Sequence, residues 1–295
     1  MPSLDSNYRG RFAPSPSGPL HIGSLVTALA SYLDARANRG QWLLRMEDID
    51  PPREQAGAAQ QITNSLLNHG MTWDGDIFWQ SARSAAYDTY LQQLLDKNLA
   101  YYCGCSRRQL AATNGLHIGT CAHPGSPNGD AIRLRVPNET IGFNDRIHGS
   151  QHRTQVELGD PVLKRKDGLY AYQLAVVVDD AEQGITDIVR GVDLLDASAW
   201  QIHLQNALGF KQPRYCHIPV IVGDDGHKLS KQSFAPALDD QYAFANLCLA
   251  LHYLQQTPPP DTINDVADLL LWATEHWRPQ DIPARRQFDA INKSL

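Results

Sequence analysis

Two short segments, far apart in the sequence, carry residue types suited to binding a nucleoside triphosphate. The first reads RFAPSPSGPLHIGS from Arg11 to Ser24 and stands where a predicted strand turns into a predicted helix. A helix N-terminus presents unpaired N–H groups and a partial positive charge, both of which favour phosphate. We expect His21 to donate to a phosphate oxygen and Gly23 to leave room for the nucleotide.

The second segment reads GHKLSKQ and places Lys228 and Lys231 three residues apart in a loop. Two such lysines can bracket a triphosphate and offset the charge that builds on departing pyrophosphate. Each segment alone is a weak signal, since most His-x-Gly pairs are structural and most Lys-x-x-Lys loops are ordinary surface. The letters LHIG even recur at Leu116–Gly119, between cysteines and without a following helical pattern. The prediction of an ATP site therefore rests on both segments together.

A third set of residues has the composition of a structural metal site. Three of the five cysteines, Cys103, Cys105 and Cys121, fall in one short segment together with His117. Three thiolates and one imidazole form a tetrahedral zinc ligand set, and His123 is the alternative fourth ligand. Buried free cysteines are the simpler alternative, but two so close in a polar, Gly-punctuated loop fit a core poorly. We expect one structural Zn²⁺ per chain, which folds the segment.

The bulk properties are those of a globular cytoplasmic chain. Of 295 residues, 42% are hydrophobic and 20% charged, and no apolar run approaches the ~20 residues that span a bilayer. An odd cysteine count without a recognisable export signal argues against disulfides. The net charge of −6 confines any RNA contact to local patches, which could equally be solvated surface charge. The candidates are Arg107–Arg108, Lys164–Lys166 and Arg285–Arg286.

Alternating strand and helix patterns predict an α/β fold with a Rossmann-like parallel sheet. In the first half, strands are predicted at 8–13 and 42–46. Helices are predicted at 20–38, from Asp50 to Gly70, and at 84–97. In the second half, strands are predicted at 133–136, 155–158, 175–178 and 215–222. A helix is predicted at 198–208, and a last helix follows the N-cap Asp261.

These patterns divide the chain into a catalytic core with an insertion and a short tail. The ranges are a first catalytic half at 1–99, an inserted zinc-binding subdomain at 100–165, a second catalytic half with the lysine loop at 166–235, and a helical C-terminal region at 236–295.

Taken together, the two phosphate segments resemble the HIGH and KMSKS motifs of class I aminoacyl-tRNA synthetases, with Ser24 in place of the last His. The runs at 11–18, 45–50, 167–180 and 189–191 narrow the resemblance, which covers roughly residues 8–240, to the glutamyl and glutaminyl members. It implies ATP with Mg²⁺ as a substrate, contacted by His21, Gly23 and Lys231. It also implies an L-glutamate site formed by Arg11, Phe12, Ala13, Pro14, Ser15, Glu47, Tyr172 and Arg190.

The residue types in that set suit an amino acid with two carboxylates. Buried carboxylates need cationic, preferably bidentate donors, and Arg11 and Arg190 are the candidates. Glu47 ends a predicted strand on the ligand-binding side of the sheet and could hold the α-ammonium. Taken singly, Glu47 could be a salt-bridge carboxylate and Arg190 a surface ion pair. The α-carboxylate is already ionised, so attack on ATP needs positioning and charge neutralisation rather than a general base.

Only about sixty residues follow the lysine loop, too few for the helical anticodon-binding domains of glutamyl-tRNA synthetases. The chain is therefore most similar to the glutamyl-queuosine tRNA(Asp) synthetase family. That resemblance implies glutamate activation without tRNA, transfer to queuosine in tRNA(Asp), and a zinc site in which His117 replaces a tyrosine ligand. We expect a monomer. The alternatives are a shortened glutamyl-tRNA synthetase, a zinc-stabilised RNA-binding module, and a cofactor adenylyltransferase.

Overall fold

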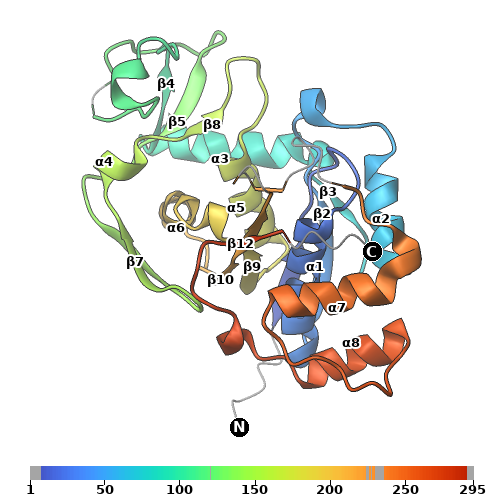
Figure 1. Cartoon of the computed structure of the whole chain (residues 1–295). Coiled ribbons are helices and arrows are strands. Elements are labelled where there is room, and N and C mark those ends of the chain that lie inside the picture. The colour runs from blue at the N-terminus through green and yellow to red at the C-terminus, as the bar shows by residue number, and fades with distance from the viewer. Residues whose placement is uncertain (1–7, 120, 224–225, 227, 230–235, 291–295) are drawn as a thin grey trace.

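A computed structural model describes residues 8–119, 121–223, 226, 228–229 and 236–290. The first half of the catalytic core is a parallel three-stranded sheet with the order β1-β2-β3 (Figure 1). Its elements, in chain order, are β1 (Arg9–Phe12), α1 (Ile22–Ala37), β2 (Gln41–Met46), α2 (Ala58–Asn68), β3 (Phe78–Trp79) and α3 (Ser84–Asp96). Strand–helix–strand alternation produces this parallel arrangement.

The second half continues the sheet beside β1. The strands are β6 (Ile141–Asp145), β7 (Gly149–Arg153), β9 (Asp187–Gly191) and β10 (Arg214–Ile218), in the order β7-β6-β10-β9. Of these, β6 and β7 come from the range 100–165 that was predicted to be the insertion. All pairings are parallel except that of β6 with β7. The N–H of Thr186, just before β9, donates to Arg9 O at 2.9 Å. Strands β1 and β9, which come from different halves of the chain, are therefore neighbours. Open α/β sheets bind ligands at such a switch in the strand order.

Helices pack against this sheet and bring the C-terminal region onto it. Leu25, Leu29 and Leu33 recur every four residues on α1 and are fully buried. The helices α7 (Ala243–Tyr253) and α8 (Val266–Glu275) cover α1 (Figure 1). Buried Asp34 accepts a hydrogen bond from the Trp277 indole at 2.9 Å. None of the described helices is long and apolar enough to cross a membrane.

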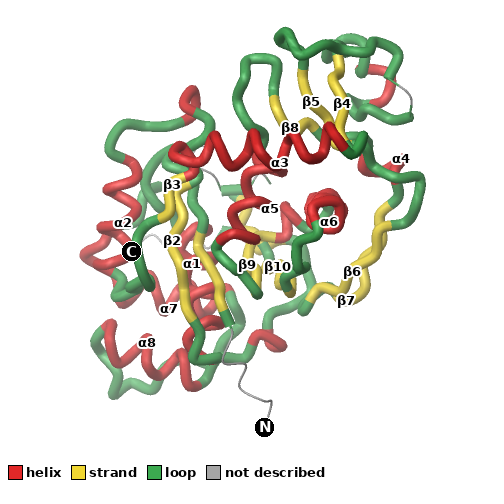
Figure 2. Tube along the Cα trace, turned by 180° about the vertical axis from the view of Figure 1, so that it is seen from behind, coloured by secondary structure: helices red, strands yellow, loops and turns green. Residues whose placement is uncertain are grey.

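The inserted segment forms its own antiparallel sheet of β4 (Ala100–Cys103), β5 (Ala131–Leu134) and β8 (Val162–Lys164). Figure 2 shows this sheet at one end of α3, away from the main sheet. The predicted Rossmann-like core with an inserted subdomain is confirmed as an architecture. The boundaries drawn at 99, 165 and 235 stay predictions.

Two strand predictions were wrong. The run at Ala175–Val178 belongs to α5 (Tyr172–Glu182). Every residue from Leu174 to Asp180 is buried, because other elements surround this helix, and such a run lacks the apolar–polar periodicity that distinguishes helix from strand. Residues 155–158 form the short helix α4 (Gln155–Leu158). Thr154 starts it by donating through its backbone N–H to Glu157 Oε2 at 2.7 Å, one half of a capping box.

Three predicted boundaries also differ from the structure. Asp50 does not open α2: residues 51–53 form one 3₁₀ turn, and Gly57, at φ 79°, precedes the helix. The strand predicted at 215–222 is two, since Pro219 lacks an N–H and separates β10 from β11 (Val220–Val222). The last helix is capped by Asp265, which accepts from Asp268 N at 3.0 Å, and not by Asp261.

The C-terminal region is not purely helical. After α8 the chain forms β12 (Gln287–Asp289), which pairs in parallel with β11. This pairing places the C-terminal segment beside the strand that leads into the lysine loop. The α6 helix (Ala197–Leu208) agrees with its prediction within one residue.

Candidate active site and metal cluster

A cleft of about 620 Å³ gathers the predicted substrate residues at the carboxyl ends of β1, β2 and β9. The segments around His21 and Lys228 border the same cleft, although some 200 residues separate them in the chain. Lys231 lies outside the described residues. The predicted residues that line the cleft are Arg11, Phe12, Ala13, Pro14, Ser15, His21, Gly23, Glu47, Tyr172, Arg190 and Lys228.

His21 is the N-cap of α1, which fixes both its position and its tautomer. Its Nδ1 accepts a hydrogen bond from Ser24 N at 3.3 Å, and its own N–H donates to Ser24 Oγ at 2.8 Å. Because Nδ1 accepts, the proton of the neutral ring is on Nε2. A Cβ on Gly23 would stand 3.2 Å from the imidazole, so the glycine leaves room for this ring. The result is a donor nitrogen at the helix N-terminus.

The lysine loop folds back onto β11. Leu229 N donates to Ile221 O at 2.8 Å, and Lys228 forms a bridge with Val222. The Lys228 ammonium donates to Asp193 Oδ2 at 2.7 Å, and both residues line the cleft. Since the Lys228 side chain is half exposed, its charge is accessible to an anion on this side of the cleft.

A buried network of charges forms the floor of the cleft. Asp180 on α5 accepts from Arg11 Nε at 3.0 Å and from Arg45 Nη1 at 2.8 Å. Arg45 also reaches Glu47 Oε1 at 3.4 Å. Burial raises the pKa of Glu47 to about 7, although the charges of Arg45 and Arg11 act in the opposite direction. Glu47 thus occupies a desolvated position where it becomes an anion near neutral pH.

Arg190 has a different environment, made only of neutral acceptors. Its Nε donates to His217 Nε2 at 2.9 Å, and its Nη2 donates to Ser198 Oγ at 2.8 Å and Gln201 Oε1 at 2.7 Å. Buried Nη1 has no hydrogen-bond partner, and no carboxylate within the described ranges forms an ion pair with Arg190. A guanidinium that is 4% exposed and lacks a counter-charge has the environment that suits an anionic ligand.

Asp145 determines which nitrogen of His217 accepts the Arg190 hydrogen bond. The His217 Nδ1 lies 2.7 Å from Asp145 Oδ2, and neither side chain is exposed. Burial lowers the pKa of His217 to about 4, so the ring is neutral. Its one proton stays on Nδ1, facing the carboxylate, which leaves Nε2 as an acceptor. Asp145 and His217 therefore orient Arg190 from behind.

Several of these residues were missed at the level of sequence. Arg45, Asp180, Asp145 and His217 received no role, because their ion pairs join distant residues: Asp145–His217, Arg45–Asp180 and Arg11–Asp180 span 72, 135 and 169 residues of the chain. A usable signal did exist for Asp180, because Asp179 and Asp180 together end an apolar run, and carboxylates in such a position need buried partners.

The predicted metal ligands Cys103, Cys105, His117 and Cys121 form one cluster whose ligand atoms all lie within 4.8 Å of one another. The Cys121 Sγ lies 3.7 Å from both other sulfurs. Tetrahedral Zn²⁺ with Zn–S bonds of about 2.3 Å separates its sulfur ligands by roughly 3.8 Å. The cluster therefore has the spacing of a closed four-ligand metal site.

A second layer of hydrogen bonds selects His117 over His123 in this cluster. Tyr101 OH donates to Asp160 Oδ2 at 2.6 Å and lies 2.9 Å from His117 Nδ1. Nδ1 must then carry the proton, and Nε2 has the lone pair that a metal needs. His123 is exposed, lies 2.8 Å from Gln109 Nε2 and is not part of the cluster.

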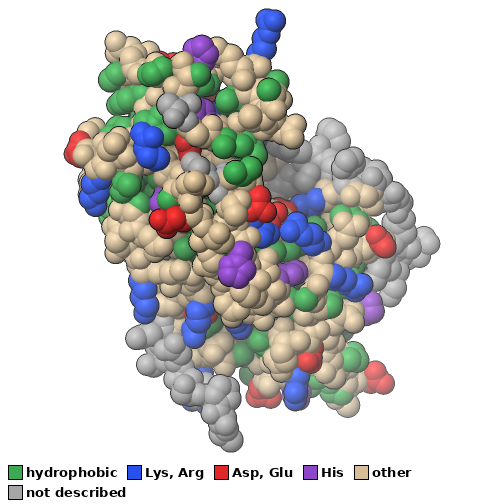
Figure 3. Space-filling model, turned by 90° about the vertical axis from the view of Figure 1, so that its left-hand side faces the viewer, with side chains coloured by type: hydrophobic (Ala, Val, Ile, Leu, Met, Phe, Trp, Pro, Cys, Tyr) green, Lys and Arg blue, Asp and Glu red, His purple; other side chains and the backbone are tan. Residues whose placement is uncertain are grey.

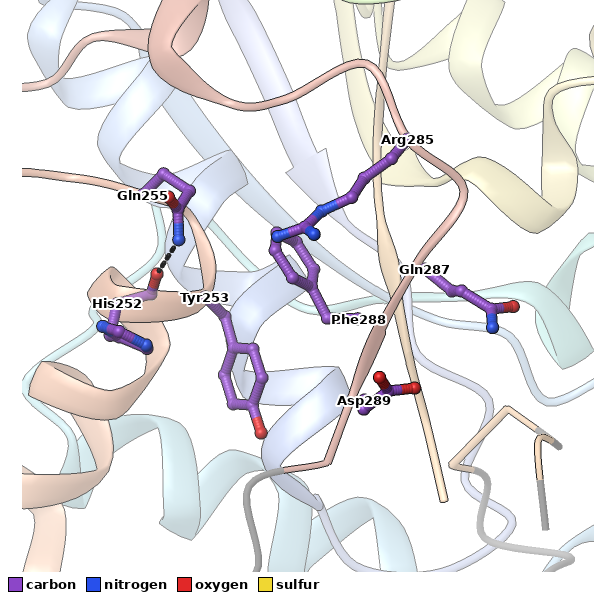
Figure 4. A pocket seen from close by; sticks show the side chains of 7 residues that line it. All are labelled: His252, Tyr253, Gln255, Arg285, Gln287, Phe288 and Asp289. Atoms are coloured by element: carbon purple, nitrogen blue, oxygen red, sulfur yellow. Dashed lines mark hydrogen bonds between the residues drawn. The ribbon is translucent and has the colours of Figure 1, made fainter. Parts of the chain in front are cut away.

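We assign no functional role to two other features, a second pocket and a basic run. A pocket between α7 and β12 has mixed polar and aromatic walls, with Arg285 3.7 Å above the Phe288 ring (Figure 4). It contains none of the predicted substrate or metal residues, although Arg285 belongs to one of the candidate RNA patches. The basic run Lys164–Lys166 is paired with Asp88, Asp50, Asp167 and Asp130. On the face in Figure 3, basic and acidic side chains are interspersed without a continuous basic stripe.

Known proteins resemble this chain over nearly its whole length. The family model for the catalytic domain of class I tRNA synthetases (E and Q) matches residues 7–129 and 122–245. A glutamyl-Q tRNA(Asp) synthetase from Pseudomonas putida is 53% identical over 291 residues, 97% of each chain. One from Pseudomonas aeruginosa is 52% identical over 284 residues, 95% of this chain and 97% of the relative.

Solved structures of longer proteins share the fold. A glutamate tRNA ligase from Elizabethkingia meningosepticum, in complex with its amino acid, superposes with a TM-score of 0.80 at 25% identity, covering 96% of this chain and 67% of that one. Glutamate-tRNA synthetase from Elizabethkingia anophelis gives a TM-score of 0.81 at 24% identity, covering 97% and 68%.

The Asp145–His217 pair predicts a specific histidine tautomer. We expect ¹⁵N NMR to find His217 neutral, with the proton on Nδ1, down to about pH 5, because its pKa is lowered to about 4. In Asp145→Asn, the amide nitrogen should face His217, since the other oxygen accepts from two backbone N–H groups. The proton should then move to Nε2. A wild-type ring protonated on Nε2 would contradict this orientation of Arg190.

Proposed function

Because the chain belongs to the glutamyl- and glutaminyl-specific class I tRNA synthetases, and among them to the glutamyl-Q tRNA(Asp) synthetases, we propose that it forms glutamyl-adenylate and glutamylates queuosine in tRNA(Asp). The observation that carries the glutamate assignment is Arg190, a buried guanidinium with only neutral partners. A ligand carboxylate supplies the missing charge, whereas a carboxamide does not.

In this proposal the pocket holds both ends of glutamate. Arg190 binds the side-chain carboxylate and Glu47 binds the α-ammonium, a counter-charge that keeps Glu47 ionised. Arg11, anchored by Asp180, faces the same cavity and adds positive charge near the α-carboxylate. Tyr172 forms a wall together with residues 12–15. Positioning of this kind is the main source of catalysis when the nucleophile is already ionised.

The phosphate end then completes the activation step. An α-carboxylate oxygen attacks the α-phosphorus of ATP, the bond to the bridging oxygen of pyrophosphate breaks, and glutamyl-adenylate remains. The His21 Nε2 donates to a phosphate oxygen, while Lys228 and Lys231 neutralise the departing pyrophosphate. Mg²⁺ enters with ATP as part of the substrate. The expected cytoplasmic location and monomeric state stay predictions.

The activation step is tested by pyrophosphate–ATP exchange. We expect glutamate-dependent exchange without any tRNA, and label from radioactive glutamate on an anticodon-loop nucleoside of tRNA(Asp) after nuclease digestion. Label only on the 3′-terminal ribose would instead identify a glutamyl-tRNA synthetase. No exchange with tRNA present or absent would favour a binding module.

Glutamate binding should depend on pH through Glu47. Its pKa is raised to about 7 in the free protein, and the α-ammonium binds only the ionised form. Lowering the pH from about 8 to 6 should therefore weaken glutamate binding about tenfold. Calorimetry without ATP avoids titration of the nucleotide. Glu47→Gln should bind weakly at every pH, and an unchanged pH profile in that variant would exclude Glu47.

We propose that the Cys₃His cluster holds one structural Zn²⁺. Metal analysis should give about one zinc per chain, and Cys105→Ser should lose it. The melting temperature should fall by at least ~5 °C, given about 2–4 °C for each kcal/mol. Cys248→Ser, a half-buried cysteine outside the cluster, is the matched control and should keep its zinc. Full zinc content in Cys105→Ser would exclude the site.

A further inference from the structure

A second cavity opens beside the glutamate pocket. Its volume is about 290 Å³, which suits a base-sized group. It shares walls with the main cleft and adds walls from three further segments, namely the turn after β2, the turn after β3 and the loop after β8. The shared residues are Ser15, Ser17, Glu47, Arg53 and Tyr172. The added residues are Ile49, Asp50, Glu54, Gln80, Arg165, Tyr170 and Ala171.

The position of this cavity relative to the substrates is informative. None of the phosphate-binding candidates, His21, Gly23 or Lys228, lines it. In the binding mode proposed above, ATP occupies the end of the main cleft near His21 and Lys228 and glutamate occupies its middle, so the second cavity adjoins only the amino-acid part. In that binding mode, the carbonyl carbon of glutamyl-adenylate is at the boundary between these parts. A nucleophile that enters through the second cavity reaches that carbon without displacing the nucleotide.

The walls of the cavity favour a cation. Asp50 is paired with Arg53 and, at 3.3 Å, with Arg165. Glu54 is different, because no cation in the described part of the chain pairs with it. Glu54 is exposed, and its partial burial, followed by the negative charges of Asp48 and Asp50, raises its pKa. A positive group placed here would relieve this crowding of carboxylates.

The chemistry of the acceptor matches these walls. Queuosine carries a cyclopentene diol on a secondary amine, which is cationic at neutral pH. Bases in a single-stranded anticodon loop can be splayed out and inserted into a pocket. Resting on the function proposed above, we propose that the cavity bounded by Ile49, Glu54 and Tyr170 binds the modified base, with its ammonium near Glu54 and its diol toward Tyr172 and the adenylate.

The transfer step follows from this placement. One hydroxyl of the diol attacks the adenylate carbonyl carbon and forms a C–O ester bond. The bond from that carbon to the phosphate oxygen breaks, AMP leaves with the electron pair, and the hydroxyl proton is released to water. The residues that line only the second cavity position the diol and take no part in activation.

Two variants separate this role from activation, because neither residue lines the main cleft. Ile49→Trp should fill the cavity, and Glu54→Lys should repel the amine. We expect tRNA-independent pyrophosphate exchange and the melting temperature to stay near wild type, while the rate of glutamate transfer to queuosine-containing tRNA(Asp) falls at least about tenfold. Glu275→Lys, an exposed glutamate at the end of α8, is the control for the same change in charge and should transfer normally.

The outcomes are distinct. Normal transfer by both variants would overturn the proposed cavity, and so would a parallel loss of exchange and transfer, since the cavity would then serve activation. Equal losses in Glu54→Lys and Glu275→Lys would show a general charge effect and also overturn it. Failure of the wild-type protein to label an anticodon nucleoside would refute the proposed function itself, which is a separate result.

Discussion

The central cleft depends on one buried carboxylate, Asp180. It lies on α5, in the second half of the chain, and pairs with Arg11 of β1 and Arg45 of β2, in the first half. All three side chains are at most 5% exposed. Removal of one partner from such a cluster leaves an uncompensated buried charge, which typically costs about 3–5 kcal/mol. The same cluster fixes Glu47 through Arg45, so the two halves of the chain must join before the pocket has its shape.

Two arginines in this cleft illustrate how the environment decides the role of a residue. Arg11 already has a carboxylate partner in Asp180, whereas Arg190 is held by a histidine, a serine and a glutamine. Neutral acceptors fix the geometry of Arg190 and leave its charge for the ligand. In the proposed function, the charge of Arg190 distinguishes a ligand carboxylate from a carboxamide, because charge interactions are strong in a desolvated site.

The elements outside the sheet stabilise and extend this centre. Asp34 on α1 accepts from Tyr8, Arg146 and Trp277, and so joins the N-terminal segment, the second half and the C-terminal region. The insertion has its own small sheet and metal cluster, and β8 leads from it to the wall of the second cavity. A closed metal site in this position is suited to holding that wall in place rather than to reacting with substrate.

Local patterns in the sequence were sufficient for the α/β class, the helix that begins at His21, the Cys₃His cluster and most cleft residues, because caps, turns and ligand spacings are short-range features. They failed for α5, whose uniform burial removes the periodicity of a helix, and they left His117 and His123 as alternatives. Only the tertiary structure brought Asp180 to Arg11 and Arg45, and Asp145 and His217 to Arg190. A buried charge is stable only beside a partner, and in this chain the partners are distant in sequence, so the pairing is decided by how the two halves pack.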